Sequence, residues 1–184
     1  MLDKYLGDSY DLVKRFWFEC LHDVAPLYAH PRFVPVKIRR KYLAVTKIPV
    51  LDEKAIPKDP YGLLLDPHTG IPLPDAATAT SAHATLKYIL EASRELRPHY
   101  MICFDQSVDR RHKLSTEKQR EKKREFLREQ GLHSFYYLSH APFLFMASNE
   151  RTLRTVRDRL IECGVPEAID AKTGKFRLQP IRPI

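Results

Sequence analysis

The sequence HYMICFD, at residues 99–105, is a short apolar run between Pro98 and a polar link, and it predicts a buried central strand. Apolar side chains at helical spacing before Pro98 predict a helix that this proline stops. After the strand, Thr116 and Gln119 resemble a capping box, and the helix that they begin is expected to end near Gly131.

Two more strands, HSFYYLS and PFLFMAS, are predicted on either side of a turn at residues 140–142. Asn149 then begins a helix that ends at Gly164, and the alternation KFRLQPI supplies a last strand. The order strand, helix, strand, strand, helix, strand is the split βαβ pattern of ferredoxin-like folds. We therefore expect an α+β protein with a ferredoxin-like βαββαβ half over about residues 99–184.

The N-terminal part is expected to add a helix, a hairpin and a second helix to the same core. Val13, Trp17 and Leu21 belong to an amphipathic helical stripe, whereas FVPVKI and KYLAVTKIPV, within residues 33–50, predict the hairpin. The proline- and glycine-rich stretch that follows, around Leu63, Leu64 and Leu65, is interpreted as a long loop or an excursion from the sheet. Because no flexible linker interrupts the chain, residues 1–184 are expected to form one domain, which could be subdivided only into residues 1–97 and 98–184.

The composition is that of an ordinary globular chain, with 43% hydrophobic and 29% charged residues. No apolar run approaches the roughly 20 residues that span a bilayer, and the N-terminus lacks a signal peptide's apolar stretch. We therefore expect a cytoplasmic protein with no membrane partner. Cys20, Cys103 and Cys163 are odd in number and far apart, which favours buried small side chains over a disulfide framework.

Positive charge is concentrated between residues 110 and 128. This segment contains nine Lys or Arg residues and three Glu residues, in a chain of net charge +8. Such a segment would bind phosphates with release of counterions, although the same charges also suit a solvated surface helix. In a ferredoxin-like fold both helices cover one face, so a second basic row on the last long helix is expected to adjoin the first. The predicted phosphate contacts are Arg110, Arg111, Lys113, Lys118, Lys122, Arg124, Arg151 and Arg154.

Asp105 follows the strongest strand, at the position where open α/β sheets commonly place a metal-binding carboxylate. It is the candidate metal ligand and, with Asp109, the candidate catalytic residue, while Asp52 and Asp66 are possible further ligands. The alternative is a turn at the end of the strand, in which Asp105 and Ser107 accept hydrogen bonds from local backbone groups.

The helix AHATLKYILEASREL and the segment RPHYMICFDQSVDRRH resemble a helix and a strand of the 5′-nuclease family, over about a sixth of the chain. The resemblance implies that Asp105 helps to bind metal and that the basic residues after it grip phosphates. It does not extend to an N-terminal strand ending in a matching aspartate or to a downstream acidic cluster.

The sequence contains no HExxH, CxxC, GxSxG, P-loop or GxGxxG motif, so the usual evidence for a hydrolase, an NTPase or a dinucleotide-binding protein is missing. The leading interpretation is a protein that binds the phosphate backbone of DNA or RNA and need not be an enzyme. One alternative is a phosphodiesterase or nuclease centred on Asp105, which would require Mg²⁺ or Mn²⁺; no other cofactor is evident. Another is a scaffold domain that forms a homodimer through an exposed sheet edge.

Overall fold

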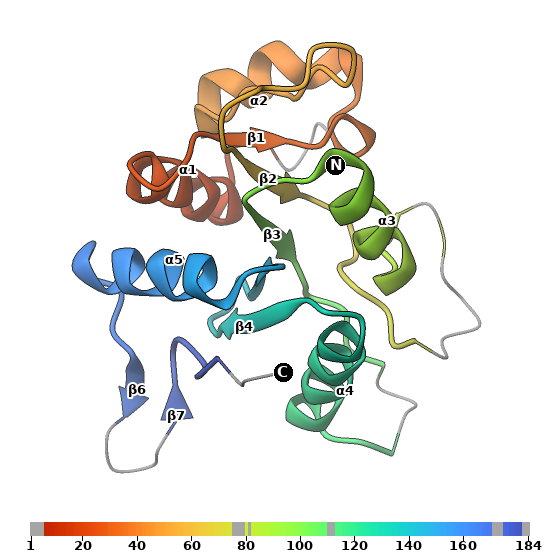
Figure 1. Ribbon diagram of the computed structural model, residues 1–184, viewed down its shortest axis with the longest axis vertical. Coiled ribbons are helices and arrows are strands. Elements are labelled where there is room, and N and C mark those ends of the chain that lie inside the picture. The colour runs from red at the N-terminus through yellow and green to blue at the C-terminus, as the bar shows by residue number, and fades with distance from the viewer. Residues whose placement is uncertain (1–5, 75–79, 81, 110–112, 171–174, 182–184) are drawn as a thin grey trace.

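The computed structural model describes residues 6–74, 80, 82–109, 113–170 and 175–181. Its central sheet has the strand order β1-β2-β3-β5-β4 (Figure 1). The strands are β1 (Leu27–Ala29), β2 (Gly62–Leu65), β3 (Tyr100–Phe104), β4 (His133–Tyr137) and β5 (Phe143–Ala147). Only β5 is antiparallel to its neighbours, so the other four strands end at the same side of the sheet, which we call the carboxyl edge.

Helices cover both faces of this sheet (Figure 1). Helices α1 (Ser9–Leu21), α2 (Arg39–Thr46) and α5 (Glu150–Glu162) contribute to one hydrophobic cluster, and α3 (Leu86–Leu96) and α4 (Thr116–Glu129) contribute to the other. Successive side chains of a strand point to opposite faces, so Leu64 enters the first cluster and Leu63 and Leu65 enter the second. The protein is therefore built in three layers, with the sheet in the middle.

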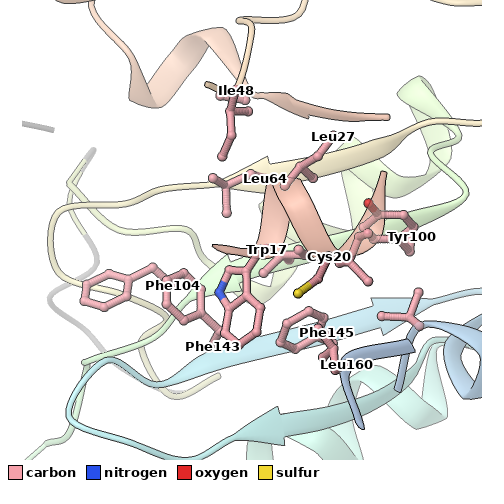
Figure 2. Packing of buried hydrophobic residues seen from close by; sticks show 14 of the residues in the cluster. Trp17, Cys20, Leu27, Ile48, Leu64, Tyr100, Phe104, Phe143, Phe145 and Leu160 are labelled. Atoms are coloured by element: carbon pink, nitrogen blue, oxygen red, sulfur yellow. The ribbon is translucent and has the colours of Figure 1, made fainter. Parts of the chain in front are cut away.

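Trp17 fixes α1 on the sheet (Figure 2). Its buried indole meets the rings of Tyr137, Phe143 and Phe145 edge-on, with centroid distances of 4.9, 5.9 and 5.4 Å. Edge-to-face packing of this kind adds to the stabilisation from buried apolar area. The N-terminal helix is thus joined to strands that follow it by more than a hundred residues.

The α+β class is confirmed, and β3, α4, β4, β5 and α5 occupy the segments predicted for them. The last two strands, β6 (Ala168–Asp170) and β7 (Lys175–Phe176), pair with each other in a separate sheet. A ferredoxin-like arrangement stays a prediction. In the sheet, β3 lies between β5 on one side and β2 on the other. Because α4 and α5 cover opposite faces, the expectation that their basic surfaces adjoin is wrong.

The predicted hairpin is also wrong, because most of residues 33–50 is helical. The 3-10 turns η2 (Pro31–Phe33) and η3 (Val36–Ile38) lead into α2. Ile38, Tyr42 and Thr46 are buried at a spacing of four residues, which is the period of a helix and not of a strand.

The segment that was expected to be a loop or an excursion supplies β2, which lies inside the sheet between β1 and β3. All four of its residues are buried, so it shows the continuous apolar run of a strand that is covered on both faces. Such a short run carries no alternation from which a strand could be recognised.

In the part of the chain that the structure describes, no helix has the length and apolar character needed to cross a membrane.

Candidate functional site

Asp105 lies directly after β3, at the carboxyl edge, and only 2% of its surface is exposed. Its Oδ2 atom is 2.8 Å from Nζ of Lys123 and accepts a 2.6 Å hydrogen bond from the Tyr136 hydroxyl. Its Oδ1 atom accepts hydrogen bonds from Lys123 at 3.1 Å and from the backbone N–H groups of Ile71 at 2.9 Å and Ser107 at 3.2 Å. The carboxylate is therefore fully hydrogen-bonded within the fold.

Lys123 reaches Asp105 because the inward stripe of α4 is polar along much of its length. Gln119, Lys123 and Leu127 lie one helical turn apart and are all buried. Lys123 also donates to the carbonyl of Ser107 at 3.0 Å, and Gln119 bonds both the N–H and the carbonyl of Asp109. The helix thereby holds the segment that leaves β3, and only its last turns contribute apolar packing.

The charge of Asp105 affects the two side chains nearest to it. Burial, and then the carboxylate of Asp105, raises the pKa of Tyr136 well above its ordinary value, so this hydroxyl stays protonated and donates. Burial and the charges of Asp105 and Asp66 also raise the pKa of Cys103 well above its ordinary value. Cys103 is consequently a buried, protonated thiol and not a nucleophile.

A second buried ion pair lies at the end of the neighbouring strand. Lys14 of α1 is 2.7 Å from Oδ2 of Asp66, which follows β2, and 2.9 Å from Oδ1 of Asp11. Burial alone would lower the pKa of Lys14, but the two carboxylates outweigh it and raise that pKa. Strands β2 and β3 are parallel neighbours in register, so the pairs Asp66–Lys14 and Asp105–Lys123 lie at adjacent strand ends.

Gly70 closes the loop between these two strand ends over Asp105. Its φ is +89°, and a Cβ atom at this position would lie 2.7 Å from the backbone nitrogens of Gln106 and Ser107 and 2.8 Å from Oδ1 of Asp105. Only glycine adopts this conformation at this distance without strain. The loop therefore packs directly on the buried carboxylate of Asp105.

The predicted metal ligands are only partly brought together. Asp66 and Asp105 end adjacent strands, but Asp66 binds Lys14 of α1 and Asp105 binds Lys123 of α4, on opposite faces of the sheet. Asp109 is exposed, and Asp52 caps its own turn by accepting a hydrogen bond from the N–H of Lys54. Among the residues whose placement is described, no group of three or more His, Cys, Asp or Glu side chains could hold a metal ion. As arranged, the site does not fit a divalent ion, since such an ion at Asp105 would have to displace Lys123.

The predicted phosphate contacts divide into several groups. Lys113, Lys118 and Lys122 are exposed on and before α4. Arg124 is only 5% exposed and donates to the carbonyls of Ser134 at 3.1 Å and Pro180 at 2.9 Å, so a phosphate contact would require these bonds to break.

The remaining predicted contacts lie elsewhere. Arg151 and Arg154 are exposed on α5, on the other face of the sheet, and Arg154 is paired with Glu150. Arg110 and Arg111 lie outside the described residues.

A contact cluster of His30, Arg32 and Tyr88 lies at the end of β1 and was not predicted from the sequence. His30 accepts a 3.1 Å hydrogen bond from the N–H of Arg32 at Nδ1, and its Nε2 is 2.8 Å from the Tyr88 hydroxyl. Burial, and then the charge of Arg32, lowers the pKa of His30 to about 4, so the imidazole is neutral near pH 7. The Arg32 guanidinium lies 4.1 Å from the centre of the Tyr88 ring. No short sequence motif marks this contact, because Tyr88 lies 58 positions after His30.

No protein-family model, curated protein or solved structure matches the chain.

Proposed function

We propose that the protein binds the phosphate backbone of nucleic acid at the amino-terminal end of α4, on the carboxyl edge of the sheet. The supporting observation is that Lys113, just before α4, and Lys118 and Lys122, within it, are all exposed. The inner side of this helix is held by buried polar contacts. Within the described part of the chain, none of these three lysines belongs to an ion pair.

The end of the helix adds to the attraction for anions. Ser115 caps α4 by accepting a hydrogen bond from the N–H of Lys118, and the first-turn N–H groups carry the positive end of the helix dipole. Lys118 and Lys122 are one turn apart, so both project from the same side of this end. Glu117 and Glu121 offset part of the charge, which is why we expect moderate affinity with a strong dependence on salt.

The test is fluorescence anisotropy of short labelled single-stranded and double-stranded DNA and RNA across a salt series. Replacing Lys113, Lys118 and Lys122 together by Gln is expected to reduce the slope of log affinity against log salt by about 0.9 for each lost contact with duplex DNA. The matched control replaces Lys58 and Lys87, which are exposed elsewhere, by Gln. Absence of wild-type binding at low salt, or equal slopes for the triple variant and the wild type, would refute the proposal.

Metal-dependent phosphodiester hydrolysis is a second candidate, with Asp105 at the carboxyl end of β3 as the ligand; Asp66 ends the adjacent parallel strand but binds Lys14 on the opposite face. It requires Lys123 to leave Asp105, so that the carboxylate becomes available to a cation. The test is cleavage of labelled DNA and RNA with Mg²⁺ or Mn²⁺, using Asp105→Asn as the variant and circular dichroism to verify its fold. Activity that depends on the metal and is lost in Asp105→Asn would support this candidate, and activity that persists in the variant would exclude it.

Dimerisation through an exposed edge strand stays a prediction, but the chain itself pairs with part of both edges. At β1, the N–H of Leu51 donates to the carbonyl of Ala29 at 2.9 Å. At β4, Leu138 and Gln179 make backbone hydrogen bonds of 2.7 and 2.9 Å that join the strand to residues 177–179. These bonds leave fewer backbone N–H and C=O groups free to pair with the edge strand of a second copy. Light scattering across a concentration series would measure the oligomeric state.

A further inference from the structure

Two of the three cysteines of the chain meet where α1 packs against α5 (Figure 1). Cys20 belongs to the last turn of α1, and Cys163 directly follows the last residue of α5. The Sγ atom of Cys163 is 4.0 Å from the carbonyl oxygen of Cys20, although the two residues are 143 positions apart in the chain. The third cysteine, Cys103, lies in β3 and is fully buried.

The thiols of Cys20 and Cys163 also interact with each other. Burial, and then a hydrogen bond with the Cys163 thiol, raises the pKa of Cys20 to about 12. Such a bond requires the two sulfur atoms to be neighbours. Cys20 lies in the hydrophobic cluster with Trp17 and Phe145 (Figure 2), whereas Cys163 is only partly buried. Cys163 is therefore the thiol that a reagent in solution reaches first.

Arg159 of α5 holds the two helix ends together. Its Nε atom donates to the carbonyl of Cys20 at 3.2 Å, and its Nη2 atom is 2.7 Å from Oδ2 of Asp23. The charge of the guanidinium also acts on both Cys20 and Cys163. This charge stabilises the negative charge that a sulfur atom carries during thiol–disulfide exchange.

We infer that Cys20 and Cys163 are a site of reversible oxidation, at which a disulfide forms between α1 and α5. The oxidant is a low-molecular-weight disulfide such as oxidised glutathione. The thiolate of Cys163 attacks one sulfur atom of this disulfide, forms a mixed disulfide with it and releases one thiol. The thiolate of Cys20 then attacks Sγ of Cys163 and releases the second thiol. Two protein thiols are thereby oxidised, the small disulfide is reduced to two thiols, and these take up the two protons that the protein loses.

The disulfide connects the N-terminal part of the chain to its C-terminal part. It closes a loop that spans 143 positions, and a long closed loop restricts the unfolded chain. Both cysteines lie at helix ends, which adjust more easily than helix interiors to a sulfur–sulfur bond of about 2 Å. We therefore expect the oxidised protein to melt about 5–10 °C above the reduced protein.

The test incubates the reduced, folded protein with oxidised glutathione. The protein is then unfolded in an alkylating reagent and digested without reduction for mass spectrometry. The expected result is a pair of peptides linked through Cys20 and Cys163, with Cys103 alkylated, and a rise in melting temperature that a reductant reverses. Absence of this link, or Cys163 held as a stable mixed disulfide with glutathione, would overturn the inference. A link that involves Cys103 would also contradict it, because that thiol reacts only when the fold opens.

Single variants separate the two steps of the exchange. Cys20→Ser should keep glutathione on Cys163, because the thiol that resolves the mixed disulfide is missing. Cys163→Ser should form neither the mixed disulfide nor the link, because Cys20 is buried. Cys103→Ser is the matched control and should form the link as the wild type does, with circular dichroism to verify the fold of each variant. Glutathione on Cys20 in Cys163→Ser would contradict the proposed order of attack.

Discussion

Three consecutive residues of α4 show how position decides the role of a charged side chain. Lys122 is exposed, Lys123 is buried against Asp105, and Arg124 is buried against two backbone carbonyls. Successive residues on a helix point about 100° apart, so one basic run serves both the solvent and the interior. A count of charges along the sequence therefore overestimates the charge that is available to a ligand.

Lys123→Ala is expected to destabilise the protein by about 3–5 kcal/mol, because it leaves the buried carboxylate of Asp105 without its cation. Lys122→Ala, one position earlier and exposed, is expected to change the free energy of unfolding by less than about 0.5 kcal/mol. Urea denaturation of both variants measures the difference. Equal and small effects would show that Asp105 does not depend on Lys123.

The pKa of His30 predicts a pH dependence of stability. Its folded-state pKa of about 4 lies below the ordinary value of 6.5, so the unfolded state binds more protons between these two values. The contribution of His30 to the free energy of unfolding is therefore greatest above pH 6.5 and is lost as the pH falls toward 4.

Between pH 7 and pH 5, the preferential protonation of His30 in the unfolded state is expected to lower the free energy of unfolding by about 2 kcal/mol. In His30→Asn, which keeps a side-chain acceptor for the N–H of Arg32, the loss of stability over this range should be smaller by that amount. Urea denaturation of both proteins at the two pH values measures it. The same loss in both would show that His30 is not the group that titrates.

At the scale of elements, the connections after the strands determine the chemistry of the carboxyl edge. The loop after β2 covers Asp105 through Gly70, and the segment after β3 is held by α4. Each connection depends on residues from a different part of the chain. The edge is consequently a hydrogen-bonded surface with Lys113, Lys118 and Lys122 exposed on its outside.

Gly70→Ala is expected to destabilise the protein by at least about 2 kcal/mol, because a positive φ and a close approach to backbone atoms act together. Gly131 is the matched control: its φ is +82°, but a Cβ atom there would meet nothing within 4 Å. Gly131→Ala should cost about 1 kcal/mol, from its backbone conformation alone. Thermal unfolding of the two variants gives the comparison, and equal losses would mean that the loop can move away from Asp105.

At the scale of the whole molecule, two hydrophobic clusters share a single sheet. Strand β2 contributes Leu64 to one cluster and Leu63 and Leu65 to the other, so neither cluster can lose its packing without disturbing this strand. Trp17 further connects α1 to the strands of the C-terminal half. These contacts join the N-terminal and C-terminal parts of the described chain, and that residues 1–184 form one domain stays a prediction.

We expect the protein to unfold in one cooperative transition. Trp17 is the only tryptophan of the chain, so its fluorescence reports the cluster under α1, while far-ultraviolet circular dichroism reports the helices on both faces. The two denaturation curves should coincide in midpoint and slope. Separate transitions would show that residues 1–97 and 98–184 unfold independently.

The sequence by itself determined the elements whose patterns are local. The apolar run at residues 99–105, the helix that begins at Thr116 and the stripe around Trp17 were predictable because each depends on neighbours a few residues away. The predicted capping box was wrong, because Ser115 is the N-cap and Gln119 binds Asp109. The α+β class followed from these elements. The position of Asp105 after a strand followed as well, because a strand and its carboxyl end are adjacent in the chain.

Only the tertiary structure decided how these elements share their surroundings. Leu63, Leu64 and Leu65 form a strand because β1 and β3 lie on either side of them, and residues 33–50 are largely helical because Ile38, Tyr42 and Thr46 pack on the core. Lys14 and Lys123 reach Asp66 and Asp105 from helices 52 and 18 positions away. Hydrogen bonds and burial over such separations depend on where the chain folds back on itself, and a local pattern of residues does not record that.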